Sequence, residues 1–236
     1  MTTTRGLWLT IALWVVAAAI FALWPELDLA TARFFYGADG FAGHTALGRA
    51  ARAFFNVTPF VVLAAFVALY GLRRLGVTLP YAPSGRALAF LIATMAIGPG
   101  LIVNLGLKDH AHRPRPAQTQ DFGGKFEFRP VGRFDGGCRK NCSFVSGEAS
   151  EAFWMVAPAS LAPPPFRAVA IGAALAFGVA TSLLRMAFGG HYLSDVILAA
   201  LLTIAIVQAG WLWLIAPERP FSRLRREKVA SRSEVG

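Results

Sequence analysis

The run VILAALLTIAIVQAGWLWLI, from Val196 to Ile215, contains no charged residue. The hydrocarbon core of a membrane is about 30 Å thick, and an α-helix of about 20 apolar residues crosses it. The backbone has no water to bond within that layer, and a helix satisfies its polar groups internally. We therefore expect residues 196–215 to form a transmembrane helix.

Five further stretches of the chain have a similar apolar character. They are Leu7–Trp24, Phe54–Leu72, Ala87–Leu107, Gly147–Ala162 and Ala168–Leu184. The stretch 147–162 is short and contains Glu151 and Pro158, so that by itself it resembles a buried or re-entrant helix. An even number of crossings and the distribution of charge favour a full crossing. The expected fold is all-α: an integral membrane six-helix bundle over residues 1–216.

The composition excludes an ordinary soluble domain. Hydrophobic residues make up 56% of the chain and charged residues 15%, whereas about 25% of a soluble domain is charged. The net charge of +10 would suggest nucleic acid as the partner of a soluble protein. In a membrane protein, basic loops that orient the helices explain it better. We expect the lipid bilayer as a partner and no nucleic acid.

Charge also predicts the orientation of the bundle. With the N-terminus inside, the inner segments carry their cations next to helix ends, where the positive-inside rule operates. The outer cations lie mainly in one long, acid-rich loop. We therefore expect a bacterial inner membrane protein with cytoplasmic termini, and a basic, disordered cytoplasmic tail over residues 217–236. Arg5 before the first apolar run leaves a signal peptide as an alternative for that run.

Two long loops are expected on the outer side. The first, Pro25–Ala53, leads into residues 46–55, which fit either an amphipathic helix on the bilayer surface or an ordinary connection. The second, Lys108–Ser146, contains the chain's two cysteines, Cys138 and Cys142. Further ligands at zinc-finger spacing do not follow them, so no metal is expected. A disulfide and two free thiols both remain open for this pair.

One polar cluster joins the last two apolar stretches, in the run RMAFGGHYLSD from Arg185 to Asp195. If a helix starts near His191, then His191 and Asp195 lie one turn apart on the same face and can touch. A carboxylate bonded to one imidazole nitrogen leaves the other nitrogen free to attack. The alternative is a capped helix with a structural histidine.

Two other clusters are expected on the same side of the membrane. Lys108 and Arg115 follow the third stretch, and with Arg185 they supply three cations for a transferring phosphoryl group. Ser146 and Gly147 precede the fourth stretch, where a helix N-terminus offers free N–H groups to an anion. Surface charge and a simple serine cap are the ordinary explanations of each cluster taken alone. Together they favour a phosphate site in the loops 108–148 and 185–195.

These residues resemble the type 2 phosphatidic acid phosphatase superfamily. Its pattern is Lys-x6-Arg-Pro, Pro-Ser-Gly-His and Ser-Arg-x5-His-x3-Asp, and the match covers the third to sixth stretches. The matching residues are Lys108, Arg115, Pro116, Ser146, Gly147, Arg185, His191 and Asp195. The resemblance implies a six-helix core and a lipid phosphatase that needs no cofactor. It implies that His191 becomes phosphohistidine, that Asp195 orients it, and that the cations, Ser146 and Gly147 hold the phosphate.

The chain departs from this pattern at three positions. Val145 replaces proline, Leu184 replaces serine, and Glu148 replaces the histidine that usually protonates the leaving oxygen. Beside several cations Glu148 should be ionised and a poor acid, unless burial raises its pKa and lets it act as the catalytic acid. His110 or His112 are the alternative acids. A weak acid favours a good leaving group, such as an anomeric sugar oxygen or a phosphate. The variant SFVSGE (143–148) also resembles the bacterial lipid A phosphatase branch.

The expected function is hydrolysis of a phosphate monoester or diphosphate of a membrane lipid, lipid A-like or an isoprenoid diphosphate, at the periplasmic face. Two alternatives remain open at this point. The chain could transfer the phosphoryl group to another lipid, or it could be an inactive protein that binds or transports a lipid phosphate. Which phosphate of lipid A is removed is not decided by the sequence.

Overall fold

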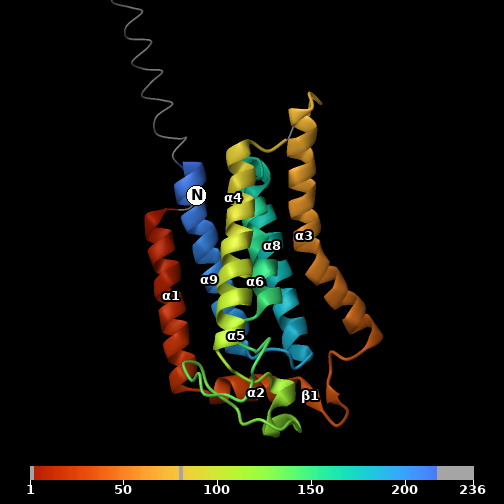
Figure 1. The fold of residues 1–236 in the computed structure, drawn as a ribbon, viewed down its shortest axis with the longest axis vertical. Coiled ribbons are helices and arrows are strands. Elements are labelled where there is room, and N and C mark those ends of the chain that lie inside the picture. Colours follow the sequence, from red (N-terminus) through yellow and green to blue (C-terminus); the bar gives the residue numbers. More distant parts are fainter. Residues whose placement is uncertain (1–2, 80–81, 217–236) are drawn as a thin grey trace, which may run out of the picture.

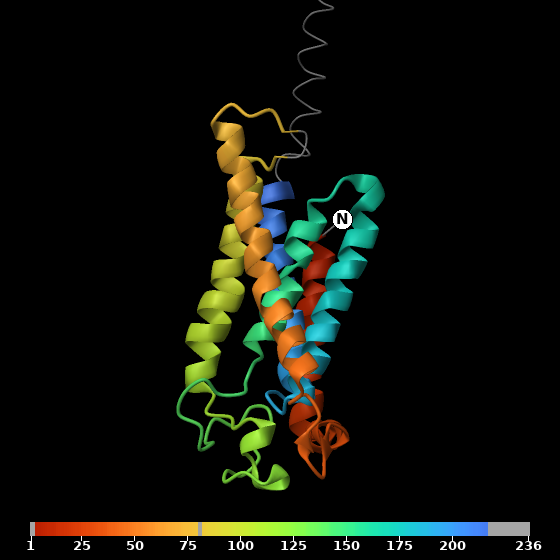
Figure 2. The ribbon, with the colours of Figure 1, turned by 90° about the vertical axis from the view of Figure 1, so that its right-hand side faces the viewer.

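The computed structural model describes residues 3–79 and 82–216, so the tail expected over 217–236 lies outside it. Five helices in this part of the chain are long and apolar enough to cross a membrane. They are α1 (Thr4–Leu23), α3 (Ala46–Arg74), the continuous helix Gly85–His110, α8 (Pro164–Ala187) and α9 (Leu193–Gly210), which continues through η4 (Trp211–Ile215). Figures 1 and 2 show them as one elongated bundle. The expected all-α membrane fold is confirmed.

The centre of the bundle is α9, which packs against α1 and α6. Leu198 and Ala199 of α9 are completely buried, and the indole N–H of Trp14 in α1 donates to the carbonyl of Leu198 (3.1 Å). The outer helices instead expose large apolar side chains along their length, among them Val15 and Val61. An exposed apolar surface of this extent is expected for helices that face lipid.

The apolar stretch 147–162 forms two short helices rather than one. They are α6 (Gly147–Trp154) and α7 (Val156–Ser160). Neither is long enough to cross a membrane alone, yet α6 is packed between α8 and α9. A Cβ on Gly178 would come within 2.6 Å of the ring of Phe153, so α8 approaches α6 closely because residue 178 lacks a side chain. The single helix expected here is therefore wrong in its continuity.

The helix Gly85–His110 has an irregular middle. It consists of α4 (Gly85–Met95), the π-helical segment η1 (Ala96–Leu107) and one final turn, α5 (Lys108–His110). Pro99 lies inside the π-helical segment. Proline has no N–H to donate and crowds the preceding turn, which favours such a local widening of the helix. Lys108 lies in the final turn of this helix, at the expected end of the bundle.

Residues 46–55 belong to α3 and form neither a separate surface helix nor a loop. Thr45 caps the first turn by accepting a hydrogen bond from the N–H of Gly48 (2.9 Å), and the helix then continues for 29 residues. Pro59 lies within it. Figure 1 shows the first part of α3 leaning away from the other helices. This part carries Arg52 to the end of the bundle where the loops gather.

Short elements cover the end of the bundle opposite to the start of α1 (Figure 1). They are α2 (Glu26–Phe34), the hairpin β1 (Tyr36–Gly37) and β2 (Gly40–Phe41), and the single turns η2 (Pro116–Gln118) and η3 (Gln120–Phe122). Leu29, Phe41, Phe122 and Tyr192 form a small apolar core beneath them. This core joins the loop 25–45 to the start of α9.

Candidate active site

The structure brings the three predicted clusters together at this covered end. A Cβ added to Gly147 would lie 2.6 Å from Nζ of Lys108, and one added to Gly190 would collide with the guanidinium of Arg185. Both glycines therefore let a cation lie against the backbone. Ser146 caps α6 by accepting a hydrogen bond from the N–H of Ala149 (3.3 Å). The helix N-terminus and two of the cations thus meet where the sequence predicted a phosphate site.

His191 is held as a neutral imidazole whose Nε2 makes no hydrogen bond to the residues that the structure describes. It is 2% exposed, and its Nδ1 lies 2.8 Å from the carbonyl oxygen of Ser143, to which Nδ1–H donates. Burial lowers the pKa of His191 to about 4, with the charges of Arg115 and Arg185 adding to the effect and Asp195 opposing it. At neutral pH the lone pair therefore resides on Nε2, which is the nitrogen available to a phosphorus atom.

The partners of Asp195 differ from the expectation. Its Oδ2 lies 3.7 Å from Nδ1 of His191, which is too far for a hydrogen bond. The carboxylate instead accepts hydrogen bonds from the hydroxyl of Ser143 and from the N–H of Tyr192 (2.9 Å). His191 and Asp195 therefore lie close together, as expected, but make no direct hydrogen bond. Ser143 links them, because its hydroxyl donates to Asp195 and its carbonyl accepts from His191.

A buried ion-pair network supports Asp195 from behind. Nη1 of Arg113 lies 2.7 Å from Oδ1 of Asp195, and Nη2 lies 2.7 Å from Oδ2 of Asp28 in α2. Ser194 donates its backbone N–H (2.8 Å) and its hydroxyl (2.6 Å) to Asp28. All of these side chains are almost fully buried. Sequence reasoning missed the network, although Arg113 stands in the same basic run as Arg115.

Arg185 has one buried donor without a hydrogen-bond acceptor in the described part of the chain. It is 3% exposed, and its Nε makes no hydrogen bond within residues 3–79 and 82–216. Its ion-pair partner is Glu148, with Nε 3.4 Å from Oε1. A buried cation without hydrogen-bond acceptors is costly unless a ligand supplies them. The oxygens of a bound phosphate would satisfy it.

Glu148 is held between two arginines. Nη2 of Arg52 lies 2.6 Å from its Oε1, and Nε of Arg52 donates to Oε2 at 3.1 Å. Nε of Arg185 lies 3.4 Å from the same oxygen, Oε1. These charges keep Glu148 ionised, so it has no proton to give to a leaving oxygen. Arg52 was missed by sequence reasoning because it lies in the segment interpreted as a surface helix or loop.

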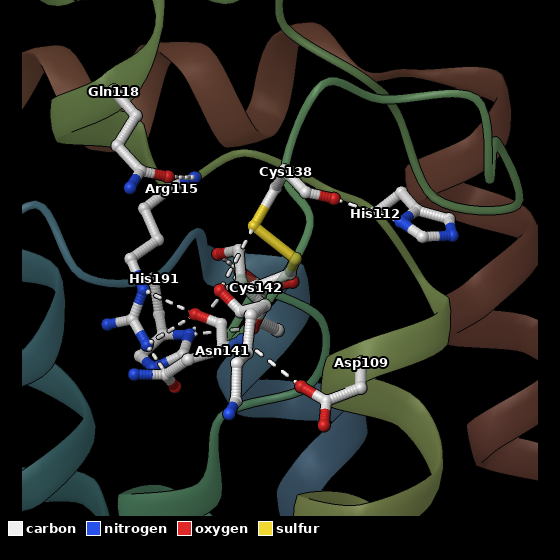
Figure 3. The surroundings of a disulfide bond; sticks show 11 residues. Asp109, His112, Arg115, Gln118, Cys138, Asn141, Cys142 and His191 are labelled. Atoms are coloured by element: carbon white, nitrogen blue, oxygen red, sulfur yellow. Dashed lines mark hydrogen bonds and ion pairs between the residues drawn. A yellow bond between two sulfur atoms is a disulfide. The ribbon is translucent and has the colours of Figure 1, made fainter.

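The two alternative acids bind backbone carbonyls. Nδ1 of His110 lies 2.6 Å from the carbonyl oxygen of Gly106, and Nδ1 of His112 lies 2.9 Å from that of Cys138. Figure 3 shows His112 on the other side of the disulfide from His191. The described contacts thus place neither histidine on the cations or on His191. Within residues 3–79 and 82–216, no three His, Cys, Asp or Glu side chains are grouped as a metal site.

The loop 108–146 contains a disulfide. Cys138 and Cys142 are joined, with their Cα atoms 5.8 Å apart. This pairing was one of the two alternatives that the sequence left open. The loop that it closes is bonded to the segment that carries Lys108, because the N–H of Cys142 donates to the carbonyl of Lys108 (3.1 Å), and Figure 3 shows Asn141 of this loop beside Asp109 and Arg115.

Comparison with known proteins agrees with this site. A family model described as the PAP2 superfamily matches residues 87–219. The chain is 36% identical over 215 residues to a protein of Rhizobium leguminosarum named lipid A 4'-phosphatase, which covers 84% of this chain and 91% of the relative. A protein of Francisella tularensis subsp. novicida with the same name is 36% identical over 75% of this chain and 81% of its own length. No solved structure matches significantly. The chain therefore belongs to the PAP2 superfamily, and it is a phosphatase of membrane lipids.

Proposed function

We propose that this phosphatase removes a phosphate from lipid A, through a phosphohistidine on Nε2 of His191, at the periplasmic face of the inner membrane. The observation that carries the proposal is the imidazole held at Nδ1 by the carbonyl of Ser143, so that Nε2 keeps the lone pair, with the charges of Arg115 and Arg185 acting on the ring. The relatives named lipid A 4'-phosphatase support the substrate. Lys108, Arg115 and Arg185 hold the phosphate, helped by Ser146 and the backbone at Gly147.

The reaction has two displacement steps. The lone pair on Nε2 of His191 attacks phosphorus, the N–P bond forms, and the bond from phosphorus to the lipid oxygen breaks. The three cations stabilise the negative charge that spreads over the phosphoryl oxygens. Water then attacks the phosphohistidine and gives up a proton, which neutralises the hydroxide left by the water that protonated the lipid oxygen; the N–P bond breaks, and inorganic phosphate leaves. Asp195 and Ser143 keep the ring in the tautomer that both steps require.

The proton for the leaving oxygen does not come from Glu148, because its ion pairs hold it as a carboxylate. We propose that water supplies this proton. The 4' position that the relatives' names print is not the anomeric carbon of a sugar. Their names therefore do not favour the anomeric leaving group that the sequence suggested. The lipid A proposal rests on the relatives, and the histidine mechanism rests on the site.

One assay of the purified protein in detergent tests the substrate. We expect free phosphate to be released from lipid A faster than from phosphatidic acid or an isoprenoid diphosphate, with no acceptor lipid added. Mass spectrometry of the product then gives the position of the lost phosphate. Equal or faster turnover of phosphatidic acid would reject lipid A as the preferred substrate. Dependence on an acceptor would favour a phosphotransferase, and inactivity on all three lipids would favour a binding protein.

Labelling of single introduced cysteines tests the periplasmic location. Lys125 lies in the loop 108–146, at the end of the bundle that holds the site. Arg74 is the last residue of α3, at the other end of the bundle, and both residues are exposed. We expect Lys125→Cys to react with a membrane-impermeant maleimide in intact cells with a permeabilised outer membrane. Arg74→Cys should react only after lysis. The two native cysteines do not react with the maleimide because they are joined in the disulfide. The reverse pattern would place the site on the cytoplasmic face.

A further inference from the structure

The disulfide-closed loop 138–142 is fastened to the segment that begins at Lys108. The N–H of Cys138 donates to the carbonyl of His112 (3.3 Å), and the N–H of Cys142 donates to the carbonyl of Lys108 (3.1 Å). The N–H of Asn141 donates to Oδ1 of Asp109 (3.1 Å). Both ends and the interior of this short loop are therefore fixed relative to a phosphate-binding lysine.

Asn141 is the residue of this loop that accepts hydrogen bonds from the side chain of Arg115. Its backbone carbonyl accepts hydrogen bonds from Nε (3.2 Å) and Nη2 (3.0 Å) of Arg115, and its side-chain oxygen accepts another from Nη2 (2.9 Å). Figure 3 shows the Arg115 side chain extending from the loop towards His191. One edge of the guanidinium is thus occupied by Asn141. In the described part of the chain, Nη1 has no hydrogen-bond partner and stays available to a phosphate oxygen.

The conformation of Asn141 suits its residue type. Its φ is +52°, in the left-handed region that asparagine, aspartate and glycine tolerate better than other residues. Its backbone carbonyl can reach Arg115 in this conformation. The disulfide between Cys138 and Cys142 closes the loop around Asn141 and restricts it to this conformation. The asparagine, its left-handed backbone and the flanking disulfide thus all support the contact with Arg115.

We propose that Asn141 is a positioning residue for catalysis: it occupies the Nε–Nη2 edge of Arg115 and directs Nη1 towards the phosphate beside His191. The inference rests on the proposed function, in which Arg115 binds the substrate phosphate. An arginine that is already ordered loses less conformational entropy when the phosphate binds. Asn141 should therefore strengthen substrate binding without touching the substrate.

Two substitutions at this position separate positioning from structure. Asn141→Gly keeps the backbone carbonyl and the positive φ but removes the side-chain acceptor, and we expect KM to rise by roughly tenfold with little change in kcat. Asn141→Asp keeps the shape and the conformation but pairs a negative charge with Arg115. It should leave the thermal midpoint unchanged or raised, and should increase KM more than glycine does. A purely structural role predicts the opposite order.

Controls make the result decisive. Gln120→Asp adds the same charge at an exposed position that does not contact Arg115, and KM should stay within about twofold of wild type. In an Arg115→Met background, Asn141→Asp should cause no further increase in KM. If Arg115→Met itself leaves turnover intact, the phosphate-binding role fails. If Arg115→Met impairs turnover while both Asn141 variants match wild type, the positioning inference alone is overturned.

Discussion

Replacement of His191 by asparagine should lower kcat by about a thousandfold or more, the scale of loss when a nucleophile is removed. Asparagine preserves a polar side chain of moderate size, but it has no nitrogen lone pair able to attack phosphorus. The measurement is release of labelled phosphate by the purified variant. Wild-type protein quenched during turnover should also carry an acid-labile phosphoryl group, and the variant should carry none.

The matched control for this variant is His44→Asn. His44 is exposed and packs edge-on against Phe188, with ring centroids 5.0 Å apart. Its replacement should leave kcat within about threefold of wild type, because the exposed ring contacts Phe188 and neither His191 nor the cations assigned to the phosphate. Should the His191 variant keep a tenth or more of wild-type turnover, the phosphohistidine mechanism would have to be abandoned.

Replacement of Arg113 by methionine should lower the free energy of unfolding by about 3–5 kcal/mol, the range for a buried ion pair that loses one partner. Arg113 contacts Asp28 and Asp195, which are both fully buried, so the variant leaves two carboxylates without their cation. Activity should fall with stability, because Asp195 contacts the Ser143 hydroxyl beside His191. Unfolding in detergent, followed by tryptophan fluorescence, gives the stability.

Two further variants frame this prediction. Arg133→Met removes an exposed arginine that pairs with Asp135, and it should not change the unfolding transition measurably. Arg113→Met combined with Asp28→Asn neutralises one of the stranded carboxylates, so it should recover part of the lost stability. Wild-type stability in Arg113→Met would show that the buried network does not hold α2 against α9.

The spanning helices could be predicted because the membrane fixes their length. Runs such as Val196–Ile215 have no stable alternative to a helix in a hydrocarbon layer. The break between α6 and α7 has a cause in the sequence, because Pro158 has no N–H to donate to the carbonyl of Trp154 and its ring crowds that turn. The position of α6 between its neighbours could not be predicted in the same way. It depends on contacts such as that between the hydroxyls of Ser150 and Thr203 in α9, which lie 2.7 Å apart, and such contacts leave no periodic signal in a short segment.

The residues of the site were predictable by type and by end of the bundle, but their pairings were not. His191 and Asp195 share one helix turn, yet His191 bonds to the carbonyl of Ser143, 48 residues earlier. Arg52 and Glu148 are separated by 96 residues. A backbone carbonyl has no residue type to recognise, and a distant charge can find several partners. Only the packing of the loops selects among them.

Asp28 and Arg52 both precede the segment 87–219 that the family model matches. A shortened chain limited to that segment would keep every motif side chain. It would nevertheless leave Arg113 with one carboxylate fewer and take away the closest ion-pair partner of Glu148. The motif residues therefore depend on contacts with residues outside the matched segment. Grafting them onto a smaller scaffold would require these two charges from the first half of the chain to be rebuilt as well.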